Sequence, residues 1–239
     1  MKERKVSETM MRIAIGFLGL AIAAMMLACS PTAQTAAAEP SSAAESSSDL
    51  FIRLIKTTAD HDKGILEMWK RGVDGRFKLT QTYEMCTWSG ALGPKLKEGD
   101  GQSPEGFYFI KPSSLNPNSS YQLSFNLGFP NAYDRAHGRT GSFLMVHGNC
   151  VSIGCYAMTD KGIEKIYAEV EKAFDGGQGF IRVHIFPFEM TTENLAAKSE
   201  NPNHGFWTNL KTGWDWFERE RVPPNVSVVG KTYRFEAAE

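Results

Sequence analysis

The sequence lacks the features that mark several classes of protein. It has no basic patch or arginine-rich run, and its formal net charge is −1 over 239 residues, so nucleic acid is not an expected partner. It has no Cys-x-x-Cys, which argues against a thiol oxidoreductase and against paired zinc knuckles. No internal repeat is visible, and no uncharged apolar run reaches the length of about 20 residues that a membrane-spanning helix needs. The composition, 42% hydrophobic and 22% charged, predicts one core of ordinary size.

The longest apolar run lies near the N-terminus. Residues 13–27 are uncharged, follow a basic stretch and are typical of a signal-peptide core. The run ends in Met26-Leu27-Ala28-Cys29, which resembles the lipobox of bacterial lipoproteins, where the cysteine becomes the lipidated first residue. Ordinary cleavage nearby and an uncleaved anchor are the alternatives. All three interpretations predict an exported protein, tethered to the membrane through its N-terminus if Cys29 is lipidated or the anchor is kept.

Three segments follow from this pattern. Residues 1–29 are predicted to be a signal peptide with a lipobox. Residues 30–48 are almost entirely Ser, Ala, Thr, Pro, Gln and Glu, which cannot bury enough apolar surface to offset the cost of ordering, so a flexible linker is expected. Residues 49–239 are predicted to form the catalytic domain.

The most informative motif is His147-Gly-Asn-Cys-Val-Ser-Ile-Gly-Cys155, which places an imidazole and a thiol eight residues apart. A cysteine attacks as its thiolate, and a nearby histidine is the usual base that produces one. Gly154 lets the backbone bend before the thiol, so that the N–H groups of Gly154 and Cys155 can face a developing oxyanion. The apolar run 143–146 predicts that His147 ends a buried strand and that the rest of the motif forms a loop, where catalytic groups are often found.

Apolar and alternating runs predict a β-rich α+β domain, with many strands and few helices. The expected strands are 50–56, 65–70, 77–86 (Phe77, Leu79, Gln81, Tyr83 and Met85 on one face), 106–110, 121–127, 143–147 and 180–186, the last ended by Pro187, with a closing hairpin over 226–235. One strong helix should follow the motif, because Ile163, Ile166, Tyr167, Val170 and Phe174 recur at helical spacing. Shorter helices are expected at 191–198 and at 206–220, the latter broken or kinked near Gly213. Residues 90–106 form a long loop.

The Ser-x-Gly-Cys core with an upstream His-Gly resembles the active site of the YkuD-type L,D-transpeptidases, cysteine acyltransferases of bacterial peptidoglycan. The glycine-rich segment that those domains carry after their early strands is similar to Ser89-Gly-Ala-Leu-Gly-Pro-Lys95, Glu98-Gly-Asp100 and Ser103-Pro-Glu-Gly-Phe107. Three features resemble the YafK-like branch in particular: the short His-to-Cys spacing, Phe129-Pro-Asn-Ala-Tyr-Asp134, and Phe206-Trp207 with Gly213-Trp-Asp215. The resemblance covers roughly residues 50–235 and implies a mixed β-sheet or sandwich architecture. Ile153 is a departure, because many members have a second histidine there.

The resemblance implies a periplasmic enzyme of cell wall organisation, peptidoglycan biosynthesis and cell shape. It would act on diaminopimelate-containing stem peptides through a thioester on Cys155, with His147 as the base and a backbone carbonyl orienting the imidazole. No cofactor is implied. The YafK-like branch is associated with cutting the link between diaminopimelate and an outer-membrane lipoprotein, so an amidase is the alternative function and that lipoprotein a further partner. A non-catalytic wall-binding lipoprotein is the least favoured alternative.

Three other residues are candidates for the substrate groove. Tyr133, Arg139 and Trp207 could serve there, because arginine can clamp a carboxylate and aromatic rings can cover a groove floor, although packing explains them almost as well. His184 lies inside an apolar strand and is expected in the core or on a sheet face. No metal is expected, since the spacing of the histidines and cysteines matches no common structural zinc pattern. The weaker alternative is a zinc site made of His137, His147, Cys150 and Cys155.

The cysteine count is odd once Cys29 is assigned to processing. Three cysteines then remain in an oxidising compartment, and one disulfide plus one free thiol is the simplest arrangement. If Cys155 is the nucleophile, Cys86–Cys150 is the candidate bridge. The alternative, Cys150–Cys155, would disable catalysis.

Overall fold

The structure is a computed structural model that describes residues 49–238. The predicted signal peptide (1–29) and linker (30–48) lie outside the described residues. None of the helices within 49–238 is long and apolar enough to span a membrane.

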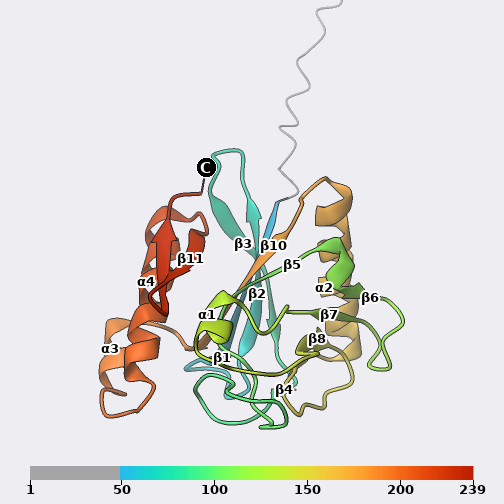
Figure 1. The fold of residues 1–239 in the computed structure, drawn as a ribbon. Helices are drawn as coiled ribbons and strands as arrows, with labels where there is room; N and C mark the ends of the chain where they lie inside the picture. Colours follow the sequence, from blue (N-terminus) through green and yellow to red (C-terminus); the bar gives the residue numbers. More distant parts are fainter. Residues whose placement is uncertain (1–48, 239) are drawn as a thin grey trace, which may run out of the picture. The chain divides into compact units, whose positions relative to one another are not determined.

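Strands dominate the described part of the chain, as the sequence predicted (Figure 1). In chain order the elements are β1 (Leu50–Thr57), β2 (Ile65–Arg71), β3 (Phe77–Glu84), β4 (Thr87–Trp88), β5 (Gly106–Ile110), a 3-10 turn (Pro112–Ser114), β6 (Leu115–Asn116), β7 (Ser124–Asn126), α1 (Ala132–Ala136), β8 (Met145–His147), β9 (Tyr156–Ala157), α2 (Asp160–Asp175), β10 (Ile181–Phe188), α3 (Thr192–Ala196), α4 (His204–Glu220), β11 (Asn225–Val229) and β12 (Thr232–Glu236). The fold is therefore α+β and β-rich, which confirms the predicted class.

The central sheet has five strands in the order β3-β2-β1-β10-β5. β1 and β10 are parallel, and the other neighbours are antiparallel. Every residue of β1 except Thr57 is buried, because both faces of the sheet are covered. Successive side chains alternate between the faces, so Ile52 and Leu54 enter one core while Phe51 and Ile55 enter others on the opposite side.

The first core lies between the central sheet, α2 and a second five-stranded sheet of order β4-β9-β8-β7-β6. Members from each of these layers are Val183, Ile166, Tyr156, Val146 and Phe125. α2 begins at the N-cap Thr159, whose side chain accepts a hydrogen bond from the Gly162 amide, and its apolar stripe faces the sheets. This packing fixes β8 and β9, the two strands that carry the His-to-Cys motif, against a rigid layer.

The second core covers the opposite face of the central sheet with α3, α4 and the β11–β12 hairpin. Figure 1 shows α4 and β11 on one side of the central strands and α2 on the other. The prediction of a break in α4 near Gly213 was wrong, since the helix is continuous over all 17 residues. Gly213 instead serves packing: a Cβ there would lie 2.5 Å from ring atoms of Phe107 and of Phe235.

Two strand predictions also need correction. β10 runs through Pro187 to Phe188, because β5 pairs with β10 only as far as Ile185, so no neighbour on that edge needs the missing N–H. The residues predicted to share one face of the strand over 77–86 do not do so: Phe77 packs with Phe51 on one side of the central sheet, whereas Met85 enters the first core on the other side. β3 is an edge strand whose register shifts opposite Met68 and Trp69, and Leu79 remains 47% exposed.

Candidate active site

The short strands β8 and β9 bring the two ends of the motif together. They pair in parallel, Val146 with Tyr156 and His147 with Ala157. Cys155 immediately precedes β9, so it lies one strand away from His147 and two positions earlier in the register. Because side chains two positions apart in a strand share a face, this register directs the imidazole and the thiol to the same face.

His147 is held in an orientation that suits a base. Its Nδ1 lies 2.5 Å from the carbonyl oxygen of Gly148, and a carbonyl can only accept, so the proton is assigned to Nδ1 and the lone pair to Nε2. The Tyr121 ring packs on the imidazole at 4.8 Å between centroids, and His147 is 3% exposed. Burial lowers the pKa of His147, opposed by the Gly148 hydrogen bond, so the imidazole is neutral near pH 7.

Cys155 is the free thiol in the described part of the chain. Its Sγ donates to the carbonyl oxygen of Phe143 at 3.6 Å rather than to His147. Burial raises the pKa of the Cys155 thiol, while a hydrogen bond from the Met145 backbone and the charge of Lys95 lower it. The thiol and the imidazole are therefore both neutral at rest, and a thiolate requires proton transfer between them.

Three serines fix the turn at Cys155. The carbonyl oxygen of Cys155 accepts from Ser103 Oγ (2.9 Å) and from Ser152 Oγ (2.8 Å). A hydroxyl has one proton, so the 3.0 Å contact between Ser152 and Ser89 is donated by Ser89. Gly154 has a φ of 141° and its Cα faces Leu144, with a Cβ position 3.1 Å from the Leu144 side chain, so only glycine fits without strain.

The predicted oxyanion donors are only partly available in this arrangement. The Gly154 amide donates to Ser152 Oγ at 3.2 Å. An oxyanion at that amide would have to displace the serine hydroxyl. The amide of Cys155 is the second predicted donor.

A buried ion pair supports the loop over residues 89–105, whose Ser103 hydrogen-bonds the Cys155 carbonyl. Lys56 Nζ lies 2.9 Å from Glu105 Oε1, and both side chains are fully buried. The same carboxylate accepts from the Gly93 amide (2.7 Å) and from the indole of Trp207 (2.9 Å), while Lys56 also donates to the Ser103 carbonyl (2.7 Å). These bonds tie Ser103, and through it the Cys155 turn, to β1 in the central sheet.

The cysteines form the predicted Cys86–Cys150 pairing and not the alternative Cys150–Cys155. Cys86 and Cys150 form a disulfide with a Cα–Cα distance of 5.1 Å, and Cys155 is free. The bridge joins the loop between β8 and β9 to the segment that follows β3. It also occupies Cys150, one of the four residues considered for zinc.

The three residues predicted to line a groove are buried, and this prediction needs correction. Trp207 is 0% exposed in the second core and donates its N–H to Glu105. Arg139 is buried in an ion pair with Asp134 at 2.8 Å. Tyr133 is 5% exposed, stacked on Tyr233. All three are committed to packing. His184, 1% exposed, lies in the interior as expected.

Sequence reasoning missed Lys95, Ser103 and Tyr121. Lys95 was noted only as part of the glycine-rich segment, but it is 3% exposed and paired with Asp100 at 2.5 Å, near enough to Cys155 to affect the pKa of the thiol. The spacing of five residues between a lysine and an aspartate in a glycine-rich loop was the available signal. For Tyr121, which lies 26 residues before the motif histidine, the sequence offered none.

The chain is similar to known proteins. Residues 67–185 match the family described as L,D-transpeptidase catalytic domain (YkuD). Over 158 residues the chain is 49% identical to the protein named "Putative L,D-transpeptidase YafK" of Escherichia coli, in strain K12 and in O157:H7. The matched part is 66% of this chain and 64% of those proteins, so the chain spans less than two thirds of these relatives.

Among solved structures, the helical cell shape determining protein Pgp2 from Campylobacter jejuni aligns with 76% of this chain and 73% of its own, at 19% identity and a TM-score of 0.44. That likeness is too weak to transfer any property of Pgp2. The family match and the 49% identity to YafK show that the chain belongs to the L,D-transpeptidase catalytic domain (YkuD) family.

Proposed function

We propose that the protein is a cysteine acyl-transfer enzyme that acts on diaminopimelate-containing stem peptides of peptidoglycan. The observation that carries the proposal is the register of β8 and β9, which sets His147 and Cys155 on one face. The bond from His147 Nδ1 to the Gly148 carbonyl leaves Nε2 as the basic nitrogen. Membership of the L,D-transpeptidase family supports the substrate class.

In the proposed reaction the thiol of Cys155 gives its proton to Nε2 of His147, and the sulfur attacks the carbonyl carbon beside diaminopimelate. The carbonyl electron pair moves to oxygen, giving a tetrahedral intermediate. Its collapse breaks the carbon–nitrogen bond, the imidazolium proton goes to the leaving amine, and a thioester remains on Cys155. A second nucleophile then gives its proton to His147 and attacks the thioester carbonyl. Collapse of this second tetrahedral intermediate breaks the carbon–sulfur bond, and the imidazolium returns the proton to the sulfur of Cys155.

Electrostatic support would come from two sides. The buried charge of Lys95 favours the thiolate, because it lowers the pKa that burial raises. The amides of Cys155 and Gly154 would hold the oxyanion, the second after release of its bond to Ser152. The two hydrogen bonds that Ser103 and Ser152 donate to the Cys155 carbonyl would keep this turn fixed through both acyl-transfer steps.

The second nucleophile decides the product. An amine from another stem peptide gives transpeptidation, and water gives hydrolysis. The family membership favours transpeptidation, whereas the similarity to the YafK-like branch favours an amidase that releases an outer-membrane lipoprotein from the wall. We propose the L,D-transpeptidase activity first and the amidase as the second candidate.

The proposed place of action is the periplasm, with the domain tethered to the membrane through a lipid on Cys29. The apolar run 13–27 and the lipobox-like Met26-Leu27-Ala28-Cys29 support this. Metabolic labelling with an alkyne fatty acid tests it: the wild-type chain should be labelled and Cys29→Ala should not. Equal labelling of both would refute lipidation at this cysteine.

Intact-protein mass spectrometry tests the reaction class. The chain is exposed to a tetrapeptide donor or to a carbapenem, and a covalent adduct on Cys155 is expected. Cys155→Ala should give none, and His147→Gln should form it far more slowly, because general-base catalysis contributes about 10²- to 10⁴-fold. Absence of an adduct on the wild type, or an equal adduct on Cys155→Ala, refutes the nucleophile.

Muropeptide analysis separates the two activities. Purified enzyme is incubated with sacculi that carry or lack the bound lipoprotein. New cross-links in either preparation favour transpeptidation, and released lipoprotein favours the amidase. If sacculi are bound equally by wild type and by Cys155→Ser and neither product forms, the non-catalytic wall-binding alternative is correct.

A further inference from the structure

A cavity lies on the other side of the central sheet from Cys155. It has a volume of about 480 Å³ and is enclosed by β5, β10, β11 and the start of α1. On β10, Ile181, Val183 and Ile185 face the first core, which contains β8 and β9, whereas Arg182 and His184 line the cavity. The sheet therefore separates the cavity from Cys155.

The cavity exists because the second core covers only part of this sheet face. Antiparallel pairing sets Phe107 beside His184 and Phe109 beside Arg182. The first pair is covered: Phe107 contacts the rings of Tyr233 and Phe235, and His184 is 1% exposed. The second pair is not, and Phe109 is 55% exposed. The β11–β12 hairpin thus covers the end of the sheet face at Phe107 and His184 and leaves the end at Phe109 open.

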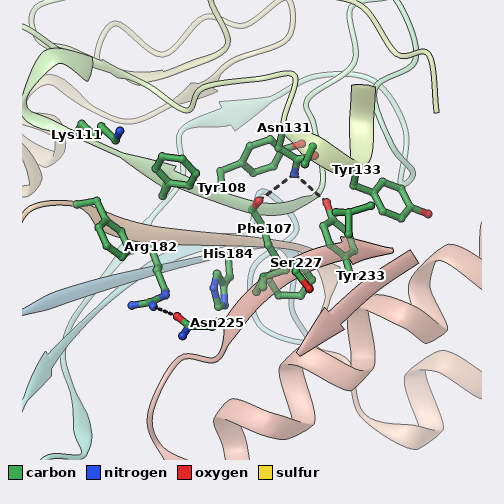
Figure 2. A pocket seen from close by; sticks show the side chains of 15 residues that line it. Phe107, Tyr108, Lys111, Asn131, Tyr133, Arg182, His184, Asn225, Ser227 and Tyr233 are labelled. Carbon is green, nitrogen blue, oxygen red and sulfur yellow. Dashed lines mark hydrogen bonds between the residues drawn. The ribbon is translucent and has the colours of Figure 1, made fainter. Parts of the chain in front are cut away.

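Two cations stand at the open end without a carboxylate partner among residues 49–238. The Arg182 guanidinium donates from Nη2 to Asn225 Oδ1 at 2.5 Å, as Figure 2 shows, and this is the one hydrogen bond of that side chain within the described part. Lys111 has neither a hydrogen bond nor an ion pair from its ammonium there. None of the cavity's lining residues is acidic. By contrast, five other arginines are ion-paired: Arg53, Arg71, Arg139, Arg219 and Arg221.

Aromatic rings complete the mouth of the cavity. The Arg182 guanidinium lies 4.9 Å from the Phe180 ring, and the Lys111 ammonium lies 5.7 Å from the Phe109 ring. The two rings are themselves in edge contact, with centroids 6.0 Å apart. Cations and rings therefore form one continuous surface, apolar in its body and positive at its edges.

Burial adds a reason to expect a ligand. It lowers the pKa of Arg182, and the nearby charge of Arg71 lowers it further, so the guanidinium is charged but poorly compensated. His184, at the floor of the cavity, has a pKa well below its usual range because of burial and the charges of Arg182 and Arg53, so it is neutral. An anion bound to Arg182 would neutralise the guanidinium charge, which no carboxylate among residues 49–238 neutralises.

We propose that this cavity binds a small anionic ligand with an apolar or aromatic body. Its carboxylate or phosphate group would lie between Arg182 and Lys111, and its body would pack on Phe109 and Phe180 and enter toward His184. The volume falls in the range of small-molecule sites, which are mostly apolar with a few placed polar groups. A bidentate contact to the guanidinium fork would set the orientation.

Fluorescence titration of the full chain with anilinonaphthalene sulfonate, an aromatic anion, tests the proposal, with uncharged phenylnaphthylamine as the matched probe. Arg182→Gln keeps a partner for Asn225 but removes the charge. This variant should bind the sulfonate about tenfold more weakly or worse, because a hydrogen bond to a charged group is worth about 1.4 kcal/mol or more. Its affinity for the neutral probe should change by less than about twofold. Lys165→Gln, an equal charge loss on the exposed face of α2, is the control and should change neither.

The N-terminal apolar run can also take up such probes, but that contribution is common to all variants and cancels in the comparison. Backbone amide shifts on titration should be confined to residues near Phe109, Arg182 and Ser227 and should spare Gly154. Equal sulfonate binding by wild type and folded Arg182→Gln, or an equal loss of both probes, would overturn the proposal. If Arg182→Gln does not fold, Lys111→Gln at an exposed position carries the same test, and unchanged sulfonate binding there is equally decisive.

Displacement of the sulfonate identifies the anion. Displacement by decanoate but not by decyl phosphate assigns a carboxylate ligand, and the reverse assigns a phosphate. Displacement by neither, at concentrations below their micelle thresholds, refutes a site for an amphipathic anion.

Discussion

Glu105 offers the sharpest test of how the fold supports the nucleophile. Its carboxylate is fully buried and takes three donors: Lys56 Nζ, the Gly93 amide and the Trp207 indole. Glu105→Gln keeps the size of the side chain but removes its charge. The amide has one acceptor oxygen in place of two, so its NH₂ group must face at least one of these donors.

The cost of that change follows from the burial of Lys56. Removing one partner of a buried ion pair leaves an uncompensated charge and costs about 3–5 kcal/mol, a large part of the 5–15 kcal/mol that holds a typical domain folded. Lys56→Met should cost less, because the Gly93 and Trp207 donors still stabilise the carboxylate. The double variant should recover much of the loss seen in Glu105→Gln, since no charge remains unpaired.

Urea unfolding of the full chain measures these differences as shifts in midpoint at constant m-value. Burial already lowers the pKa of Lys56, and loss of Glu105, which raises it, lowers it further. Between that folded pKa and the unfolded value of about 10.4 the unfolded chain binds more protons, so the stability of Glu105→Gln should rise with pH in this window. A loss below about 1 kcal/mol, or a double variant as unstable as the sum of the singles, would refute the argument.

Three further predictions concern the thiols. Alkylation of Cys155, followed peptide by peptide in the full chain, should rise with pH with a midpoint above the ordinary thiol value of about 8.5, because burial raises its pKa; a midpoint below 7 would contradict a neutral resting pair. Lys95→Gln should move that midpoint higher still, with slower adduct formation at pH 7, and an unchanged midpoint would show that Asp100 fully screens the lysine. Replacing Cys86 and Cys150 together by alanine opens a loop of 64 residues and should cost about 4 kcal/mol in urea unfolding; less than about 1 kcal/mol would mean that the loop is held without the bridge.

The sequence predicted those elements whose own residues determine them. β1 and β10 are apolar runs of strand length, and α2 has an unbroken apolar stripe, so their positions were visible without the structure. β4 and β9 are two residues long and are strands only because they pair with each other and with β8. No local pattern can reveal an element that exists through a partner distant in sequence.

The residues of the candidate site also differ in how far the sequence alone could predict them. His147 and Cys155 could be proposed from the sequence because their chemistry and their spacing are local. Trp207 was assigned to a groove because its residue type suits one, whereas its indole N–H is used by Glu105 in the core. The sequence did not indicate that Lys95 is buried, because lysines seldom are and the pairing with Asp100 depends on the folded loop.

The turn at Cys155 is restrained from both sides, and this bears on how the site can act. On one side the Cys86–Cys150 bridge anchors the loop five residues before the nucleophile. On the other, β9 and the hydrogen bonds of Ser103 and Ser152 fix the nucleophile's own carbonyl. Burial shifts the pKa of the thiol up and that of the imidazole down, so the fold disfavours a resting ion pair. In the mechanism we propose, a rigid turn with a neutral pair would form its thiolate as the substrate arrives, so proton transfer to His147 would be part of the acylation step rather than a preceding equilibrium.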